Sequence, residues 1–147
     1  MTTVSDILLP ECLRLSLSSA NEKEAVWDVS MLLKTDTRVA DWRCFHDHLK
    51  TTLIETGPTR KVFLAHARTD AVTTMVMSAG RRGNEEAGGV VEYFFVIGVP
   101  LQMAADYLRI IGALARVFRD NDAEQALRKA SEPGRFISIL AGKAAAL

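Results

Sequence analysis

The chain has 147 residues, with 18 basic and 18 acidic side chains, and 48% of its residues are hydrophobic. This length suits one ordinary domain with its own core, so we expect residues 1–147 to form a single domain. The balanced charge argues against a nucleic-acid binder, because such domains usually have a net basic surface. No apolar run approaches the ~20 residues of a membrane span. The N-terminus also lacks the regions of a signal peptide, and we expect a soluble, cytoplasmic protein.

The first half of the chain alternates between strand and helix patterns. Residues 13–18 alternate apolar and polar side chains, which predicts a strand with one buried face. Two amphipathic helical patterns follow, over residues 25–33 and from Val39 to Leu53. The first of these helices has two candidate N-terminal caps, Ser19 in a Ser-x-x-Glu capping box and Asn21.

Three apolar runs in the middle of the chain predict strands over residues 62–65, 72–78 and 90–99. The third run is nearly continuous and rich in β-branched and aromatic residues, which is typical of a central strand buried on both faces. The polar, glycine-rich segment 80–89 is predicted to be a loop between strands. We expect its Arg81–Arg82 pair to lie in a solvated turn.

The last third of the chain predicts three helices. One follows Pro100 and extends to Phe118, a shorter one is capped at Asp120, and the last begins at Pro133. The order of strands and helices predicts an α/β fold, a layered domain with a central mixed β-sheet of about four to five strands flanked by helices on both faces.

His66 is the histidine best placed for chemistry, because it follows a predicted strand and precedes a polar turn, where a sheet can hold a ligand-facing side chain still. Its ordinary pKa of about 6.5 allows it to act as a nucleophile or base near neutral pH. Phosphoryl capture by histidine needs a neutral ring nitrogen and donors around the transferred oxygens. Thr59, Arg60, Lys61 and Arg68 are close in sequence and could supply these donors.

The other histidines and the cysteines have structural interpretations. His46 and His48 diverge by about 200° on a helix, so we expect them on the solvated surface rather than on one metal ion. Cys12 and Cys44 are predicted to be small buried residues. Motifs for metal ligation, for nucleotide phosphates and for a serine nucleophile are missing from the sequence, which predicts no metal and no cofactor.

Five segments occur in the order found in one known family. They are residues 6–15, 21–26, 63–68, 90–100 and 107–115. The third segment, Phe-Leu-Ala-His-Ala-Arg, is similar to the Ala-Ile-Pro-His-Ala-Arg stretch that holds that family's phosphorylated histidine. Over residues 5 to 142 the chain thus resembles the enzyme IIA domains of the fructose, mannitol and nitrogen-regulatory type in the bacterial phosphotransferase system.

This resemblance implies an enzyme IIA-like fold and a regulatory phosphocarrier. His66 would accept a phosphoryl group from a small histidine phosphocarrier protein, and the domain would signal by contact with a regulatory target protein. Thr59, Arg60 and Arg68 would line the phosphate. Tyr107, which stands in place of the family's second histidine, would contact the His66 ring or its phosphate.

Two other interpretations remain open. The family has an arginine where Ile54 stands, a longer glycine-rich loop where residues 56–61 stand, and a histidine at Tyr107. These differences would suit a degenerate enzyme IIA-like module that is not phosphorylated and binds a regulatory protein through the same face. The third interpretation is an unrelated small-molecule-binding α/β domain.

Overall fold

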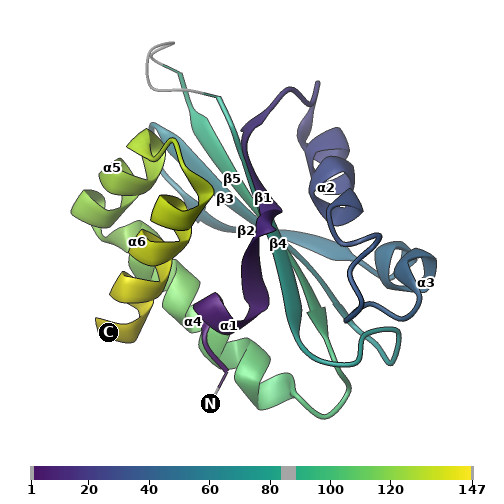
Figure 1. Ribbon diagram of the computed structural model, residues 1–147. Coiled ribbons are helices and arrows are strands. Elements are labelled where there is room, and N and C mark those ends of the chain that lie inside the picture. Colours follow the sequence, from purple (N-terminus) through teal and green to yellow (C-terminus); the bar gives the residue numbers. More distant parts are fainter. Residues whose placement is uncertain (1, 84–88, 147) are drawn as a thin grey trace.

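A computed structural model describes residues 2–83 and 89–146 of the chain (Figure 1). Its helices and strands follow in the order α1 (Val4–Ile7), β1 (Leu8–Leu17), α2 (Glu22–Met31), α3 (Trp42–Asp47), β2 (Lys50–Thr56), β3 (Arg60–Arg68), β4 (Val76–Arg82), β5 (Val91–Val99), α4 (Ala104–Arg119), α5 (Asn121–Lys129) and α6 (Pro133–Ala146). In the part that the structure describes, no helix is both long and apolar enough to cross a membrane.

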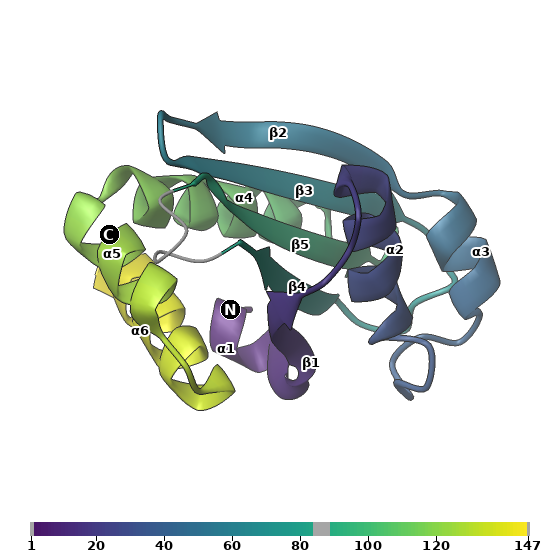
Figure 2. The ribbon, with the colours of Figure 1, turned by 90° about the horizontal axis from the view of Figure 1, so that it is seen from above.

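The strands form one five-stranded sheet in the order β1-β4-β5-β3-β2. β1 is parallel to β4 and β3 is parallel to β5, whereas β4 is antiparallel to β5 and β2 is antiparallel to β3. This arrangement confirms the predicted α/β fold with a mixed sheet. Figure 2 shows β2 along the outer rim of the sheet, with no other element beyond it.

Helices cover both faces of the sheet (Figures 1 and 2), as predicted. One face packs against α1, α4, α5 and α6 through a cluster that includes Val62, Leu64, Tyr93 and Leu114. The opposite face packs against α2 and α3 through a second cluster that includes Phe63 and Phe94. β5 lies between the two clusters, and all nine of its residues are buried, which confirms its prediction as a central strand.

The predicted helix from Val39 to Leu53 is wrong over most of its length. Only Trp42–Asp47 is helical, and the chain re-enters the sheet at Lys50 as β2. Threonine and isoleucine dominate residues 51–56, and their branched side chains fit a pleated strand better than a helix. Pairing of β2 with β3 therefore outweighs the apolar spacing that suggested a helix.

The two alternatives for the start of α2 are also resolved. The Asn21 side chain accepts a hydrogen bond from the Glu24 amide at 2.9 Å and is the N-cap. The Ser19 hydroxyl instead donates a hydrogen bond at 2.6 Å to the carboxylate of Asp28, further along α2. Asn21 thus satisfies one of the free amides at the helix N-terminus.

Arg81 and Arg82 were predicted to lie in a solvated turn. This prediction is wrong, because both residues lie in β4 and are partly buried. The Arg81 guanidinium donates to the carbonyls of Leu15, Leu127, Arg128 and Ala130 at 2.8–3.1 Å. Arg82 forms an ion pair with Glu92 on the neighbouring strand β5. The remainder of the predicted loop includes residues 84–88, which lie outside the described part of the chain.

The close approach of α2 to β4 predicts a strong effect of a methyl group at Gly80. A Cβ atom there would lie 2.6 Å from Leu17 Cδ1 and 2.7 Å from Val29 Cγ2, so both side chains would have to move. We expect Gly80→Ala to lower the free energy of unfolding by about 1–3 kcal/mol in urea denaturation. The control is Gly89→Ala, because a Cβ at Gly89 has no neighbour within 4 Å. Equal denaturation midpoints for the two variants would contradict this packing.

Candidate functional site

His66 lies near the end of β3, between β2 on one side and β5 on the other. In the ladders it is opposite Lys50 of β2 and Ile97 of β5. Its side chain shares a sheet face with Val62 and Leu64, which pack against α4. The strand therefore holds His66 at the boundary between the buried sheet and the surface, as its position in the sequence suggested.

Tyr107 of α4 lies against the His66 ring. The two ring centroids are 4.9 Å apart, and the rings are inclined by 30°. Both side chains are half-buried. Burial raises the pKa of the Tyr107 hydroxyl to about 12, so the hydroxyl keeps its proton at neutral pH and can donate a hydrogen bond. The predicted ring contact between Tyr107 and His66 is thus present in the structure.

The surroundings of His66 favour the neutral form of its ring. Burial lowers its pKa below the usual value, and the positive charge of Lys50 lowers the pKa further. The Nδ1 atom is enclosed and has no hydrogen-bond partner among the described residues. Nε2 is therefore the ring nitrogen that an incoming group can approach.

Two cationic side chains lie on the same sheet face as His66. Lys50 is directly opposite it in the antiparallel ladder, where facing Cβ atoms are about 5 Å apart. Arg68 follows two residues along β3, about 7 Å away at Cα, and is exposed. Lys50 was missed in the sequence analysis because residue 50 was placed in a helix. Strand pairing is the signal that reveals it.

Thr59 and Arg60 do not share this site. Arg60 begins β3 and is six residues from His66 along a continuous ladder, which corresponds to about 20 Å. The Thr59 carbonyl accepts a hydrogen bond from Arg128, so this turn is anchored to α5 at the far end of the strand. Closeness in sequence suggested that both would line a phosphate on His66, but an extended strand separates them from it.

The arrangement predicts how His66 should titrate. Its NMR titration midpoint should lie below 6.5, and Lys50→Gln should raise the midpoint by removing a positive charge. The midpoint of the variant should still lie below 6.5, because burial is the larger cause and remains. A wild-type midpoint at or above 6.5 would contradict the enclosed setting of the ring.

His46 is not a solvated surface residue, which corrects its prediction. Its ring stacks on Trp42 at 4.9 Å and meets the edge of Trp27 at 4.5 Å. Its Nδ1 is 2.9 Å from the Ser30 hydroxyl, and burial lowers its pKa. His48 is exposed. Cys12 is buried as expected, whereas Cys44 is half-buried, and both thiols are free.

The site around His66 combines a neutral ring nitrogen, two cations and a protonated phenol. A neutral imidazole is a nucleophile, and cations or hydroxyls nearby stabilise negative charge on the group that it receives. This chemistry suits the acceptance of an anionic group by the histidine.

Comparisons with known proteins agree with this fold. A structure titled nitrogen regulatory protein IIA-Ntr, from Neisseria meningitidis, superposes with a TM-score of 0.75 at 18% identity, covering 93% of this chain and 98% of that chain. A PTS IIA domain from Streptococcus pyogenes M1 GAS superposes with a TM-score of 0.67 at 12% identity, covering 97% and 96% of the two chains. These likenesses show a shared fold.

No curated protein matches the sequence. The family model described as "Phosphoenolpyruvate-dependent sugar phosphotransferase system, EIIA 2" matches residues 6–143, which is nearly the whole chain. That span contains β1 to β5, and with them His66 and its neighbours Lys50 and Tyr107. The chain therefore belongs to the EIIA 2 family of the phosphoenolpyruvate-dependent sugar phosphotransferase system.

Proposed function

We propose that this protein is a regulatory phosphocarrier, in which His66 accepts a phosphoryl group from a small histidine phosphocarrier protein. The observation that carries the proposal is the neutral His66 ring, packed on Tyr107 and facing Lys50. The phosphorylated or unphosphorylated domain would then act on a regulatory target by direct contact. Residues 1–147 would work as a single domain in the bacterial cytoplasm.

The transfer step needs no cofactor. The Nε2 lone pair of neutral His66 attacks the phosphorus atom of the donor phosphohistidine, a new P–N bond forms, and the P–N bond to the donor ring breaks. The donor ring, protonated on its other nitrogen, leaves as a neutral imidazole, and the proton of the His66 ring stays on Nδ1. Lys50 and Arg68 would offset the charge on the phosphoryl oxygens, and the Tyr107 hydroxyl would donate a hydrogen bond to one of them.

An exposed apolar surface next to the site would receive the partner. Leu101 is 51% exposed in the turn after β5, and Leu108, the residue after Tyr107 on α4, is 68% exposed. Exposed apolar side chains beside a reactive residue are typical of a protein contact surface. The partner, the small histidine phosphocarrier protein, would cover these leucines when its phosphohistidine approaches His66.

The proposal is tested by incubating the protein with phosphoenolpyruvate, the general phosphotransferase enzyme and the histidine phosphocarrier. Intact-mass spectrometry should show the gain of one phosphoryl group, which acid removes. His66→Ala should gain none, whereas the matched control His48→Ala, at the exposed histidine directly after α3, should gain the group like wild type.

The result for the wild-type protein distinguishes a phosphocarrier from a protein-binding module that is not phosphorylated. If wild type gains no phosphoryl group from any cognate carrier, the phosphocarrier proposal fails, and a protein-binding module that is not phosphorylated takes its place. If His66→Ala gains the group as wild type does, another residue is the acceptor.

A further inference from the structure

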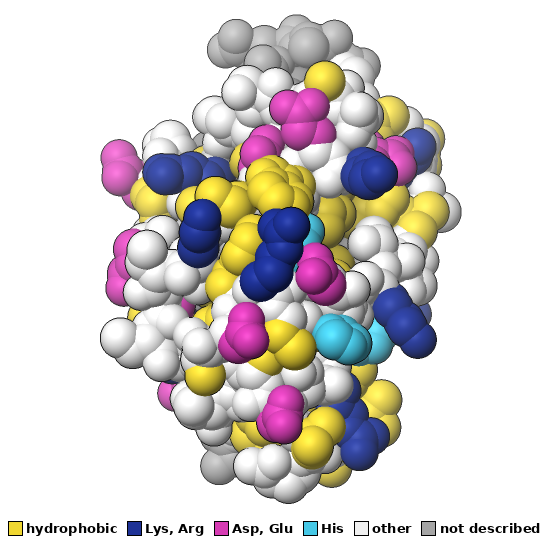
Figure 3. All heavy atoms as spheres, turned by 90° about the vertical axis from the view of Figure 1, so that its right-hand side faces the viewer, with side chains coloured by type: hydrophobic (Ala, Val, Ile, Leu, Met, Phe, Trp, Pro, Cys, Tyr) yellow, Lys and Arg dark blue, Asp and Glu magenta, His cyan; other side chains and the backbone are white. Residues whose placement is uncertain are grey.

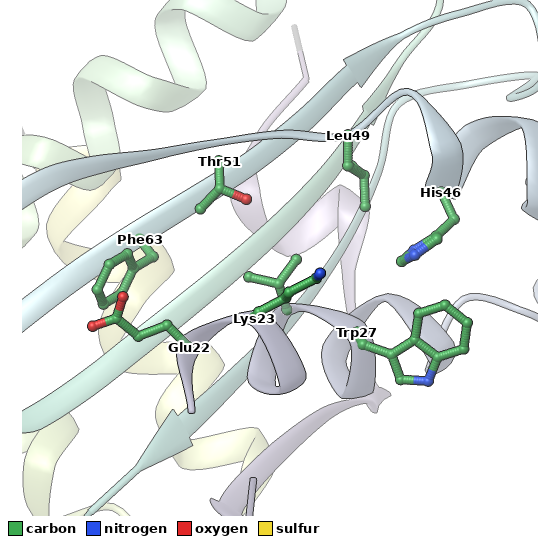
Figure 4. Close-up of a pocket in the computed structure, with 8 residues that line it drawn as sticks. Glu22, Lys23, Trp27, His46, Leu49, Thr51 and Phe63 are labelled. Carbon is green, nitrogen blue, oxygen red and sulfur yellow. The ribbon is translucent and has the colours of Figure 1, made fainter. Parts of the chain in front are cut away.

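A second surface lies on the opposite face of the sheet from His66. α2 packs over β1, β4 and β5, whereas Thr51 and Leu53 of β2 are exposed on this face. A cleft of about 380 Å³ lies there, lined by Val26, Trp27, His46, Leu49, Thr51 and Phe63 with Glu22 and Lys23 at its rim. Figure 4 shows these side chains reaching the cleft from α2, from α3 and the segment after it, and from β2 and β3.

The cleft is apolar and partly open to solvent. Trp27 is 40% exposed, and Leu53, which follows Thr51 on the same face of β2, is 45% exposed. Figure 3 looks onto the side of α2 and α3 and shows hydrophobic side chains gathered in the middle of this face. We call this surface, made of the cleft and Leu53, the β2 surface.

The outer edge of β2 adds a backbone feature to this surface. Within the described residues, β2 is the last strand of the sheet and pairs only with β3, so alternate amides and carbonyls point away from the sheet. Residues 50–53 pair regularly with residues 66–63, and the bulge follows only after Leu53. A regular, unpaired edge of this kind can bind another extended strand.

The side chains of β2 are complementary to a second copy of the same strand. If two β2 strands pair antiparallel about Thr52, Thr51 of one copy lies opposite Leu53 of the other, both on the cleft side of the sheet. Each exposed Leu53 would then cover the open side of the other copy's cleft, beside its Thr51. Such an arrangement is isologous and closed by a two-fold axis.

The charges of β2 fit the same pairing. Lys50 lies on the α4 side of the sheet, opposite Ile54 of the second copy. Because of the bulge, Glu55 also lies on the α4 side, where its carboxylate is 3.5 Å from Arg119. Glu55 follows Ile54 on the same side of the sheet, so each Lys50 would lie diagonally from Glu55 of the other copy, with opposite charges near each other on both sides of the axis.

We infer that the protein self-associates through antiparallel pairing of two β2 strands, with Leu53 of each copy over the other copy's cleft. Sedimentation equilibrium over a series of protein concentrations tests this. The mass of wild type should rise from 16.2 kDa towards twice that value. Leu53→Lys should stay monomeric, and the control Leu108→Lys, at a more exposed leucine on α4, should dimerise like wild type.

A charge reversal tests the register of the pairing. Lys50→Glu should weaken dimerisation about 10-fold, because it brings two carboxylates near each other beside the axis, and added salt should reduce the difference from wild type. Circular dichroism should show the same fold for every variant. Monomeric wild type at all concentrations would overturn the inference. Dimerisation of Leu53→Lys with wild-type affinity would overturn it too. These measurements require no phosphorylation.

Discussion

Lys50→Gln should slow phosphoryl transfer to His66 about 10- to 100-fold. Lys50 lies opposite His66 in the β2–β3 ladder, and its charge already lowers the His66 pKa. A charge-assisted hydrogen bond to a phosphoryl oxygen contributes roughly 1.5–3 kcal/mol, which corresponds to this range of rates. The initial rate of transfer from the phosphorylated carrier measures the effect in rapid-quench experiments.

The matched control for this substitution is Lys61→Gln. Lys61 lies on the same strand as His66 but five residues away, and its side chain is on the opposite sheet face. We expect its transfer rate to stay within about twofold of wild type, because the charge is far from the reacting nitrogen. Equal rates for wild type and Lys50→Gln would show that Lys50 does not contact the transferred group.

Arg81→Met should lower the free energy of unfolding by about 3 kcal/mol or more. The Arg81 guanidinium satisfies carbonyls at the C-terminus of α5 and in β1. Burial lowers the pKa of this guanidinium. The four carbonyl oxygens that accept its hydrogen bonds hold the guanidinium in position. Methionine fills similar space but leaves several acceptors without donors, each at a cost of about 1–3 kcal/mol.

Urea denaturation monitored by circular dichroism measures this loss. Arg43→Met is the control, because the Arg43 side chain is 70% exposed and its pair with Asp47 is separated by 3.7 Å. Such an exposed pair contributes little, so we expect a change within about 0.5 kcal/mol. If Arg81→Met were as stable as Arg43→Met, the anchoring of α5 to the sheet through Arg81 would be refuted.

The parts of the fold that local patterns predicted are those where one signal dominates. The continuous apolar run of β5 marks a strand buried on both faces, and the Asp120 and Pro133 positions mark helix starts. β2 was missed because Leu49 and Leu53 repeat at a helical spacing, and only pairing with β3 decides in favour of a strand. The local sequence pattern does not indicate the pairing of β2 with β3.

The candidate site was predictable in its centre but not in its neighbours. His66 stands out by its place after an apolar strand, and Tyr107 was identified through the family resemblance. Thr59 and Arg60 were expected beside it because they are close in sequence, but a strand rises about 3.3 Å per residue and separates them. Lys50 is sixteen positions away along the chain and is brought opposite His66 by the sheet.

The position of the phosphoryl group on the His66 ring tests the central claim most directly. After incubation with phosphoenolpyruvate, the general enzyme and the carrier, phosphorus–proton correlation NMR distinguishes Nδ1 from Nε2 phosphohistidine. Because Nδ1 is enclosed by the protein, we predict a single phosphohistidine at Nε2 of His66. A phosphoryl group on Nδ1, on another residue, or on none would contradict the account.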